Sequence, residues 1–296
     1  MDKISYIKLV GTGNDFVLVD ALHRGGLRAI NWPRLARTLC DPKRGEGTDG
    51  LLVLGPSRRA SVRMRIFNPD GSEPAMCGNG IRCLAWYARR AGAAPSTMTI
   101  ETGAGIKRAR IQGPHRVRVN MGAPVFRRRF ERLFRHDGRP GDADLVDSGV
   151  PHLVCWTPTV SRIEVETLGR RLRHDSRLGR GGANVDFVQL LQARGSRALL
   201  KMRTYERGVE GETQACGTGS VAAAAAYVRR ALLERPSHQA WRRFSIDVRV
   251  PGGTLQVELT ARRDSGARVT FGPAFLEGRV QSVSTGSYTS NGRSAR

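Results

Sequence analysis

One segment of this chain occurs twice and decides the fold. Residues 64–90 read MRIFNPDGSEPAMCGNGIRCLAWYARR, and residues 202–230 read MRTYERGVEGETQACGTGSVAAAAAYVRR. Each copy has a strand-like run, a polar turn, a cysteine with two nearby glycines, and an apolar run with helical spacing. Cys77 in the first copy therefore corresponds to Cys216 in the second. The recurrence predicts a fold made by duplication.

The match extends in both directions from this segment. GTGNDFVLVD at 11–20 is similar to GANVDFVQLL at 182–191, and TMTIETGAGIKRARI at 97–111 is similar to FSIDVRVPGGTLQVEL at 244–259. We therefore predict two copies of one domain, with a boundary in the Gly- and Pro-containing stretch 122–145. The halves are residues 1–122 and 123–270, with a last strand near 270–281 that joins the first half. The Ser-, Gly- and Arg-rich tail 282–296 has little to bury, and we expect it to be disordered.

Short runs bounded by turn residues predict the strands of each half. They are FVLVD, LLVLG, VRMRIF, TMTIET and RVRVNM in the first half, and LVCW, DFVQLL, LLKMRTY, SIDVRV and TLQVEL in the second. A single longer helix is predicted after each cysteine, over IRCLAWYARRAG and SVAAAAAYVRRALL. The pattern predicts two sheets, each of which wraps one central helix.

The charge of the chain raises nucleic-acid binding as a non-enzyme alternative. The net charge is +23, and only five of the 49 basic residues are Lys. The arginines are spread along the chain instead of gathering in one basic arm. The densest patch, FRRRFERLFRHDGRP at 126–140, predicts an amphipathic turn or strand with a solvated basic face and with Phe126, Phe130 and Phe134 in core contacts. We expect no nucleic-acid partner.

The cysteines and the apolar runs argue against a disulfide-rich, metal-binding, secreted or membrane protein. The five cysteines are scattered without CxxC pairs, so we expect neither a disulfide framework nor a metal site. No run of eighteen apolar residues and no secretory leader is evident, so we expect a cytoplasmic protein without a membrane partner. Cys40, Cys83 and Cys155 lack a special context and are interpreted as core residues.

The surroundings of Cys77 and Cys216 favour acid–base chemistry. A cysteine at a helix N-terminus lies at the positive end of the helix dipole, which favours its thiolate. The glycines that follow let backbone N–H groups approach an anion such as a carboxylate. Either cysteine alone could be a small buried hydrophobe, but two that face each other across a cleft could remove a proton from one face of a carbon and return it to the other. This predicts a racemase or epimerase.

Three segments carry a resemblance to a known family. KLVGTGNDFVLVD, MRIFNPDGSEPAMCGNGIRC and YERGVEGETQACGTGS resemble the signature segments of diaminopimelate epimerases, and the resemblance spans residues 3 to about 280. It implies an α+β fold of two pseudo-symmetric domains, each a mainly antiparallel β-sheet around a central α-helix, with the active site in the cleft between them. It also implies a cofactor-independent isomerase that converts LL-diaminopimelate to the meso form, on the route to lysine and peptidoglycan.

The resemblance assigns roles to individual residues. Cys77 and Cys216 would act as thiolate base and thiol acid and exchange these roles with the reaction direction. His152 and Glu206 would tune the two thiols. The partner would be a small amino-acid substrate, no metal would be bound, and the resemblance allows a homodimer. The substrate-binding positions would be Asn14, Asn68, Gly78, Asn79, Asn184, Glu206, Arg207, Gly217 and Thr218.

Three departures from the family pattern bear on the substrate. Val150 occupies a position where many members have an Asn that contacts the distal end of the substrate, and valine cannot donate that hydrogen bond. Gly50 stands where some members have Gln, and ERGVEGET is one residue longer than the shortest family form. A racemase or epimerase of another amino acid, of the histidine or proline type, therefore stays open as an alternative.

Overall fold

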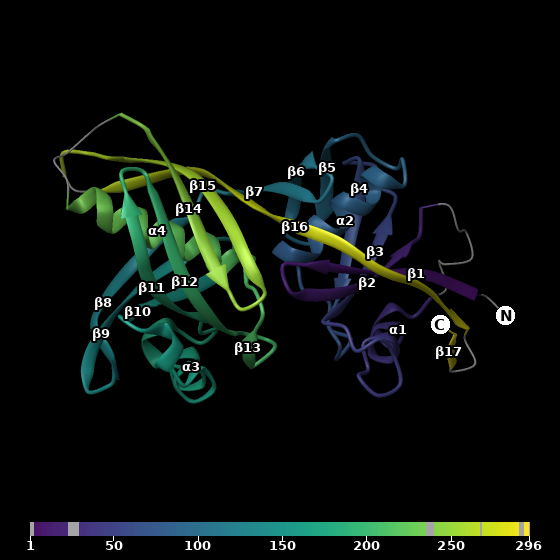
Figure 1. The fold of residues 1–296 in the computed structure, drawn as a ribbon, viewed down its shortest axis with the longest axis horizontal. Helices are drawn as coiled ribbons and strands as arrows, with labels where there is room; N and C mark the ends of the chain where they lie inside the picture. Colours follow the sequence, from purple (N-terminus) through teal and green to yellow (C-terminus); the bar gives the residue numbers. More distant parts are fainter. Residues whose placement is uncertain (1–2, 23–29, 235–239, 267, 290–292, 296) are drawn as a thin grey trace. The chain divides into compact units, whose positions relative to one another are not determined.

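The computed structural model describes residues 3–22, 30–234, 240–266, 268–289 and 293–295 (Figure 1). The chain divides into two compact units, one of residues 1–119 with 278–296 and one of residues 120–277. The boundaries fall inside two strands, β7 (Arg116–Gly122) and β16 (Val269–Thr289). Each half of β16 thus belongs to a different unit, and the C-terminal residues complete the N-terminal one.

The strands of the first unit form a closed ring. Backbone pairing runs in sequence order from β1 to β7, and the end of β16 pairs with both β7 and β1. The helix α2 (Gly78–Arg90) contacts β1, β2, β3, β4 and β6, so it lies inside this ring. The other elements are β1 (Lys3–Gly11), β2 (Asn14–Asp20), α1 (Trp32–Leu39), β3 (Gly50–Gly55), β4 (Val62–Phe67), β5 (Thr97–Thr102) and β6 (Gly105–Gly113).

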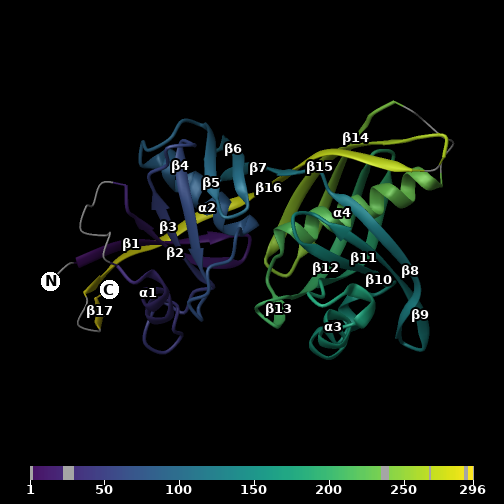
Figure 2. The same cartoon turned by 180° about the vertical axis from the view of Figure 1, so that it is seen from behind.

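The second unit repeats the plan around α4 (Gly217–Leu233). This helix contacts β9, β10, β11, β14 and β15, as Figure 2 shows from behind. The strands are β8 (Val125–His136), β9 (Arg139–Asp147), β10 (Pro151–Trp156), β11 (Asn184–Arg194), β12 (Arg197–Glu206), β13 (Gly211–Thr213), β14 (Arg242–Val250) and β15 (Gly253–Arg263). The helical segments are η2 (Val160–Arg162), α3 (Val165–Arg173) and η3 (Ser176–Leu178).

Parallel strand pairs occur at the same places in both units. In the first, β2 pairs parallel with β3 and β4 with β5; in the second, β10 pairs parallel with β11 and β12 with β14. A parallel pair needs a crossover, and α1, α2, α3 and α4 lie in these four connections in chain order. Most other strand pairs are antiparallel, as for β1 with β2 and β14 with β15. The predicted duplication and the mainly antiparallel sheets around a central helix are confirmed.

The composition of α4 explains why it can lie at the centre of its unit. Five consecutive alanines, Ala222 to Ala226, are all buried. Because a helix that is buried on every side must be apolar on every side, alanine suits this position and also has the strongest intrinsic helix preference. The small side chains let the surrounding strands approach the helix backbone closely.

Two helices were absent from the sequence-based prediction. The helix α1 has only eight residues, yet its start is encoded, because Asn31 accepts a hydrogen bond from the backbone N–H of Arg34 and Pro33 lies in the first turn. The helix α3 has nine residues with the sequence VETLGRRLR, and four of them are Arg or Glu. It buries Val165 and Leu172. The buried residues of both helices do follow a helical spacing, so the sequence held a signal that the prediction missed, and each helix has fewer than ten residues.

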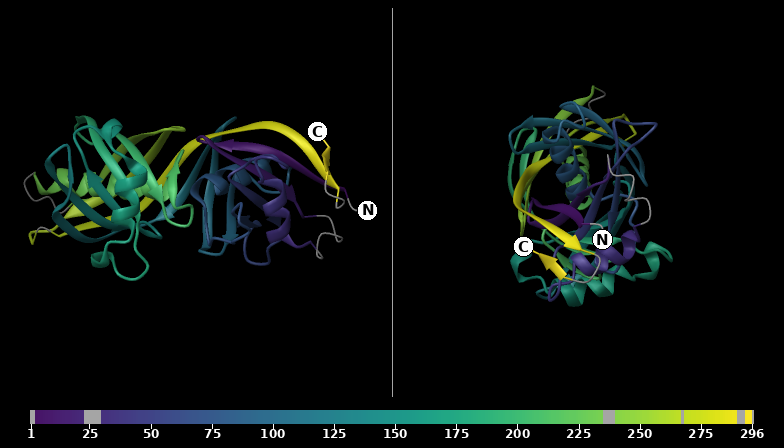
Figure 3. Two further views of the ribbon diagram at one scale, coloured as in Figure 1. Left: turned by 90° about the horizontal axis from the view of Figure 1, so that it is seen from below. Right: turned by 90° about the vertical axis from the view of Figure 1, so that its right-hand side faces the viewer.

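The tail 282–296 was expected to be disordered, and this expectation is wrong for the described part. Residues up to Thr289 continue β16 and pair antiparallel with β1, from Gly11↔Val280 to Lys3↔Thr289 (Figure 3). Arg293–Ala295 form β17, which pairs with β16. Residues 290–292 and 296 lie outside the described residues. The prediction judged only the side chains, whereas a strand ladder is held by backbone hydrogen bonds that small polar residues make equally well.

The stretch 122–145, predicted to separate the halves, is instead the antiparallel hairpin of β8 and β9. Phe130 and Phe134 are buried as predicted, and the guanidinium of Arg229 lies 3.8 Å from the ring centroid of Phe126. Two arginines of β8 pair with carboxylates on β9, Arg127 with Asp147 (3.0 Å) and Arg129 with Asp142 (2.7 Å). The basic face is thus partly neutralised within its own hairpin.

The packing of α3 on β12 gives a stability test. A Cβ on Gly169 would lie 2.5 Å from Cβ of the buried Tyr205. We expect Gly169→Ala to lower the free energy of unfolding of the second unit by about 1–3 kcal/mol in spite of the better helix propensity, because Tyr205 cannot move away. Gly211→Ala is the control, since its new Cβ would make an ordinary 3.6 Å contact with Glu166. Urea denaturation in which both variants unfold alike would contradict this packing.

Candidate active site

Cys77 is the N-cap residue of α2. Its backbone is extended, and its Sγ accepts a hydrogen bond from the backbone N–H of Gly80 at 3.4 Å. The N–H groups of the first turn of a helix have no partner within the helix, so the thiol satisfies one of them. The side chain is half-buried, which leaves part of it accessible. The predicted position at a helix start is confirmed.

A directed chain of hydrogen bonds joins the predicted binding residues Asn14 and Asn79. Arg82 Nη2 donates to Asn79 Oδ1 (2.8 Å), Asn79 Nδ2 donates to Asn14 Oδ1 (2.6 Å), and Asn14 Nδ2 donates to Asp49 Oδ2 (3.0 Å). A guanidinium can only donate and a carboxylate can only accept. Both ends of the chain therefore fix which way the two amides point.

Arg82 and Asp49 were not predicted as site residues. The Arg82 side chain is fully buried and also donates to Gly78 O (2.9 Å) and Thr12 Oγ1 (2.9 Å). Burial lowers the pKa of Arg82 to about 10, while the nearby thiols of Cys83 and Cys77 act in the opposite direction. An arginine in an otherwise apolar helical run was the available signal, since charged side chains are rarely buried without partners.

Asn68 lies apart from this chain of amides in the sequence and in its contacts. It follows β4, where its Nδ2 donates to Ser72 Oγ (2.9 Å) and its backbone N–H donates to Ser72 O (2.9 Å). The structure therefore places Asn68 in the turn that precedes Cys77. Its predicted contact with substrate stays a prediction.

Cys216 is the N-cap residue of α4 and repeats the geometry of Cys77. Its Sγ accepts from the backbone N–H of Gly219 at 3.4 Å and lies 3.4 Å from Thr218 Oγ1. The residue is only 5% exposed. Thr218 was predicted as a substrate-binding position, and its hydroxyl also contacts the thiol.

His152 belongs to the same cluster and has a carboxylate partner that was not predicted. Its Nδ1 lies 2.7 Å from Asp186 Oδ2, and its Nε2 lies 2.9 Å from Thr218 Oγ1. The side chains of His152 and Asp186 are fully buried. A Cβ on Gly219 would lie 2.5 Å from Asp186 Oδ1, so this position has to be glycine. The sequence did hold a signal for Asp186. When GANVDF (182–187) is aligned with GTGNDF (11–16), Asp186 falls opposite Asp15, so an aspartate recurs at the same place in both halves.

Asn184, Glu206 and Arg207 surround this cluster. Asn184 Oδ1 accepts from the backbone N–H of Arg207 (2.8 Å), which turns Nδ2 toward His152 Nε2 (3.2 Å). Glu206 Oε2 accepts from Thr213 Oγ1 (3.0 Å). The structure thus brings together the site residues predicted in the second unit.

The electrostatic surroundings of Cys216 favour the thiol. Burial raises its pKa well above the usual value, and the carboxylates of Glu206 and Asp186 raise it further. Hydrogen bonds from Thr218 and from the Gly219 N–H lower the pKa but do not offset the other effects. Burial and these carboxylates thus oppose the thiolate that the helix start alone would favour at Cys216.

The other cysteines are buried, as predicted for core residues. Burial raises the pKa of Cys40 to about 11 and that of Cys83 to about 12, and it raises the pKa of Cys155 well above the usual value. In the described parts of the chain, no group of three His, Cys, Asp or Glu side chains could hold a metal ion. Among the same residues, no helix is long and apolar enough to cross a membrane.

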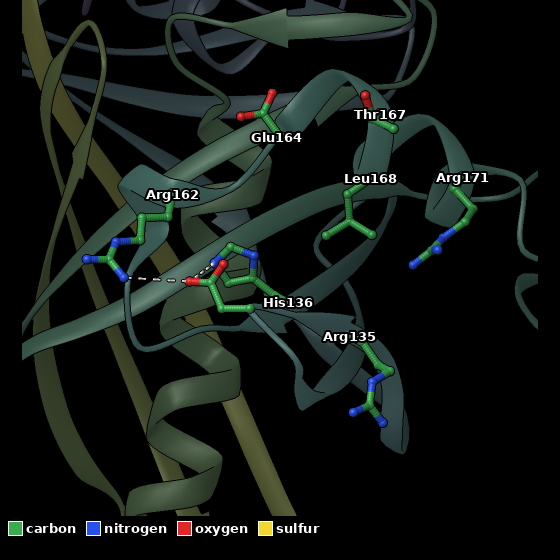
Figure 4. Close-up of a pocket in the computed structure, with 8 residues that line it drawn as sticks. Arg135, His136, Arg162, Glu164, Thr167, Leu168 and Arg171 are labelled. Carbon is green, nitrogen blue, oxygen red and sulfur yellow. Dashed lines mark ion pairs between the residues drawn. The ribbon is translucent and has the colours of Figure 1, made fainter.

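A pocket of about 300 Å³ lies in the second unit where the end of β8 meets α3 (Figure 4). Asp137 Oδ2 lies 3.4 Å from His136 Nε2 and 3.8 Å from Arg162 Nη1 in this pocket. Acidic and basic side chains compensate each other there, and neither Cys77 nor Cys216 lines it. The lining residues are Arg135, His136, Asp137, Arg162, Glu164, Thr167, Leu168 and Arg171.

The carboxylate beside Cys216 gives a test of these electrostatics. We expect Glu206→Gln to lower the pKa of Cys216, because it removes a negative charge that opposes the thiolate. More thiolate at neutral pH would increase the rate of alkylation of Cys216 by iodoacetamide, measured by mass spectrometry of its peptide. Cys77 in the same sample is the internal reference. A rate that stays equal or falls would mean that Glu206 does not act on this thiol as a charge.

Comparison with known proteins agrees with this geometry. A family model described as diaminopimelate epimerase matches residues 6–127 and 145–276. The chain is 37% identical to a diaminopimelate epimerase of Methanothrix thermoacetophila, over 97% of this chain and 96% of that protein. It is 38% identical to that of Archaeoglobus fulgidus, over 87% of this chain and 90% of that protein.

Solved structures show the same fold at low sequence identity. A phenazine biosynthesis protein of the PhzF family from Bacillus anthracis matches with a TM-score of 0.70 at 17% identity, over 98% of this chain and 100% of the other. A probable proline racemase from Agrobacterium radiobacter matches with a TM-score of 0.69 at 18% identity, over 97% and 93%. The extent of the sequence match and the repeated cysteine-capped helix lead to one conclusion: this chain belongs to the diaminopimelate epimerase family of isomerases.

Proposed function

We propose that this chain interconverts LL- and meso-diaminopimelate, with Cys77 and Cys216 as the two acid–base groups. The observation that carries the proposal is the repeated N-cap: each cysteine accepts a backbone N–H at 3.4 Å at the start of the central helix of its unit. One thiolate removes the α-proton and the other thiol returns a proton to the opposite face of the same carbon. Because the chemistry consists of two proton transfers, both thiols are needed and no cofactor is required.

The substrate carboxylate at the reacting carbon binds to the two helix starts. Backbone N–H groups at Gly78, Asn79, Gly217 and Thr218 are suited to this role, since helix N-termini attract anions. An anion held there also stabilises the negative charge that develops as the α-proton leaves. In the second unit, Ser148 Oγ donates to Thr218 O (2.9 Å) and steadies this helix start.

The distal end of the substrate is bound by polar side chains. A zwitterionic end needs a carboxylate for its ammonium and a guanidinium for its carboxylate, and Glu206 and Arg207 supply these. Asn14, Asn68 and Asn184 add amide donors and acceptors. Val150 lacks the amide that many members have at its position, so another amino acid with a similar carboxylate end is the alternative substrate.

The two thiols have different electrostatic surroundings. Burial and the carboxylates beside it raise the pKa of Cys216, which suits a proton donor. Cys77 is less buried and lies near the cationic Arg82, which suits the base. In this assignment Cys77 deprotonates the substrate first, and the roles exchange in the reverse direction. His152 and Glu206 adjust the thiols during the cycle.

Solvent exchange tests this function directly. In deuterated water the enzyme should introduce deuterium at the α-carbon of LL-diaminopimelate, measured by mass spectrometry or proton NMR. Cys77→Ala and Cys216→Ala should each reduce interconversion by roughly 100-fold or more, because each removes one general acid–base group. Cys155→Ala, a change at a buried cysteine, is the control and should retain most activity.

A substrate panel separates the alternatives. Exchange with proline or histidine but not with diaminopimelate would replace the proposed substrate while keeping the mechanism. Interconversion that survives both cysteine changes would refute the mechanism. Tight, salt-dependent binding to DNA or RNA without any α-proton exchange would support the nucleic-acid alternative instead.

A further inference from the structure

The buried side chain of Arg82 joins the start of α2 to the turn between β1 and β2. Its guanidinium donates to Gly78 O (2.9 Å), Thr12 Oγ1 (2.9 Å) and Asn79 Oδ1 (2.8 Å). Asn79 Nδ2 in turn donates to Asn14 Oδ1 (2.6 Å). We propose that Arg82 is the positioning residue that holds the substrate-binding groups of the first unit in one fixed arrangement. Arg82 affects turnover only through those groups, so this role rests on the proposed function.

The turn between β1 and β2 contains a residue that is unfavourable for its backbone conformation. Thr12 and Gly13 are the two central residues of the turn, and both have positive φ values, 55° and 83°. A two-residue hairpin turn with two positive φ values favours Asn-Gly, whereas a β-branched residue is strained in this region. The buried Thr12 hydroxyl accepts from Arg82 Nη2. This hydrogen bond offsets the strain and fixes the turn that leads directly into Asn14.

The same guanidinium sets the direction of the Asn79 amide. Only the oxygen of an amide can accept from Arg82, so Asn79 Nδ2 has to face Asn14 Oδ1. A flipped Asn79 would place its NH2 group against the guanidinium and lose both hydrogen bonds. Because Asn79 is only 3% exposed, water has little access to replace them. The orientation of Asn14 is therefore fixed from two sides, by the turn and by the neighbouring amide.

The contact with Gly78 fixes the backbone at the start of α2. The carbonyl of Gly78 and the N–H of Asn79 belong to one planar peptide group, in which they point in opposite directions. Arg82 Nη1 holds this carbonyl at 2.9 Å. The N–H of Asn79 thus keeps one direction, away from the oxygen that the guanidinium binds. In the proposed function, this N–H is one of the groups that bind the substrate carboxylate.

The surroundings of Arg82 are costly for a cation, so stability alone does not explain an arginine at this position. The three oxygens that accept from it belong to a carbonyl, a hydroxyl and an amide. Among the described residues, its buried Nε has no hydrogen-bond partner. An apolar side chain of similar size would fill the same space without the cost of burying a charge. The planar fork of a guanidinium, in contrast, can hold three acceptors at once.

A matched pair at Thr12 tests this role without a change of charge. Thr12→Val keeps the β-branched shape but removes the acceptor, whereas Thr12→Ser keeps the hydroxyl. We expect Thr12→Val to raise KM for LL-diaminopimelate about tenfold and to change kcat by less than about twofold, because it weakens binding equally in the ground and transition states. Thr12→Ser should stay close to wild type. The control is Thr102→Val, which removes a hydroxyl of the same 8% exposure from the turn between β5 and β6.

Two results at Thr12 would overturn the proposal. One is a valine variant with the KM of wild type, or with a fall in kcat at constant KM. The other is a serine variant as impaired as the valine variant, since the hydroxyl would then not be the group that matters.

Nuclear magnetic resonance of the substrate-free enzyme separates this role from the proposed function. The order parameters of the side-chain NH2 groups of Asn14 and Asn79 are measured with ¹⁵N-labelled asparagine. We expect Arg82→Met and Arg82→Lys to lower both order parameters, because neither a thioether nor a single ammonium reproduces the fork. Thr12→Val, which keeps the cation, should lower that of Asn14 even if the Arg82 variants fail to fold.

The substrate-free results decide the role of Arg82 independently of activity. Wild-type order in Thr12→Val, or full order in Arg82→Lys, would refute the proposal, since geometry would then not be what the guanidinium supplies. Reduced order in the variants of an enzyme that does not exchange the α-proton of diaminopimelate would support the positioning role and refute only the proposed substrate.

Discussion

The constraint on which this protein depends is the need to satisfy the first N–H groups of a helix that is surrounded by strands. At a surface, water would bind these groups, but α2 and α4 lie inside their sheets. In both units a cysteine sulfur accepts one N–H at 3.4 Å, and glycines leave the neighbouring backbone groups open to an anion. The same unsatisfied groups therefore position the thiol and, in the proposed function, bind the substrate carboxylate.

The duplicated backbone carries different charges in its two copies. Near Cys77 the buried ionic group is Arg82, which directs the amides of Asn79 and Asn14. Near Cys216 the buried ionic group is Asp186, which holds His152. The fold makes the two thiols equivalent in position. A cation beside one and anions beside the other make their electrostatic surroundings different. The two helix starts thus share one backbone geometry, and a few buried side chains give them different electrostatic surroundings.

Much of this fold could be predicted from sequence, since the repeat and the period of the apolar residues indicated two sheets around α2 and α4. The short helices α1 and α3 were missed although their buried residues follow the helical period, because each has fewer than ten residues. The end of β16 was missed because backbone pairing holds it. The cysteines were predictable as a repeated motif. Arg82 and Asp186 left only weak signals in the sequence, because their importance comes from contacts such as that of Arg82 with Thr12, 70 residues apart in the chain.

The division of β16 between the units has a consequence for folding during synthesis. The second unit is one continuous stretch, residues 120–277, and all its strands up to β15 precede its share of β16. The first unit lacks one strand of its ring until residues 278–289 leave the ribosome. Domains generally fold in the order of their synthesis. This chain departs from that order, since the unit whose synthesis begins first is completed last. Its β1 and β7 have to wait with unpaired edges until the final strand closes the ring.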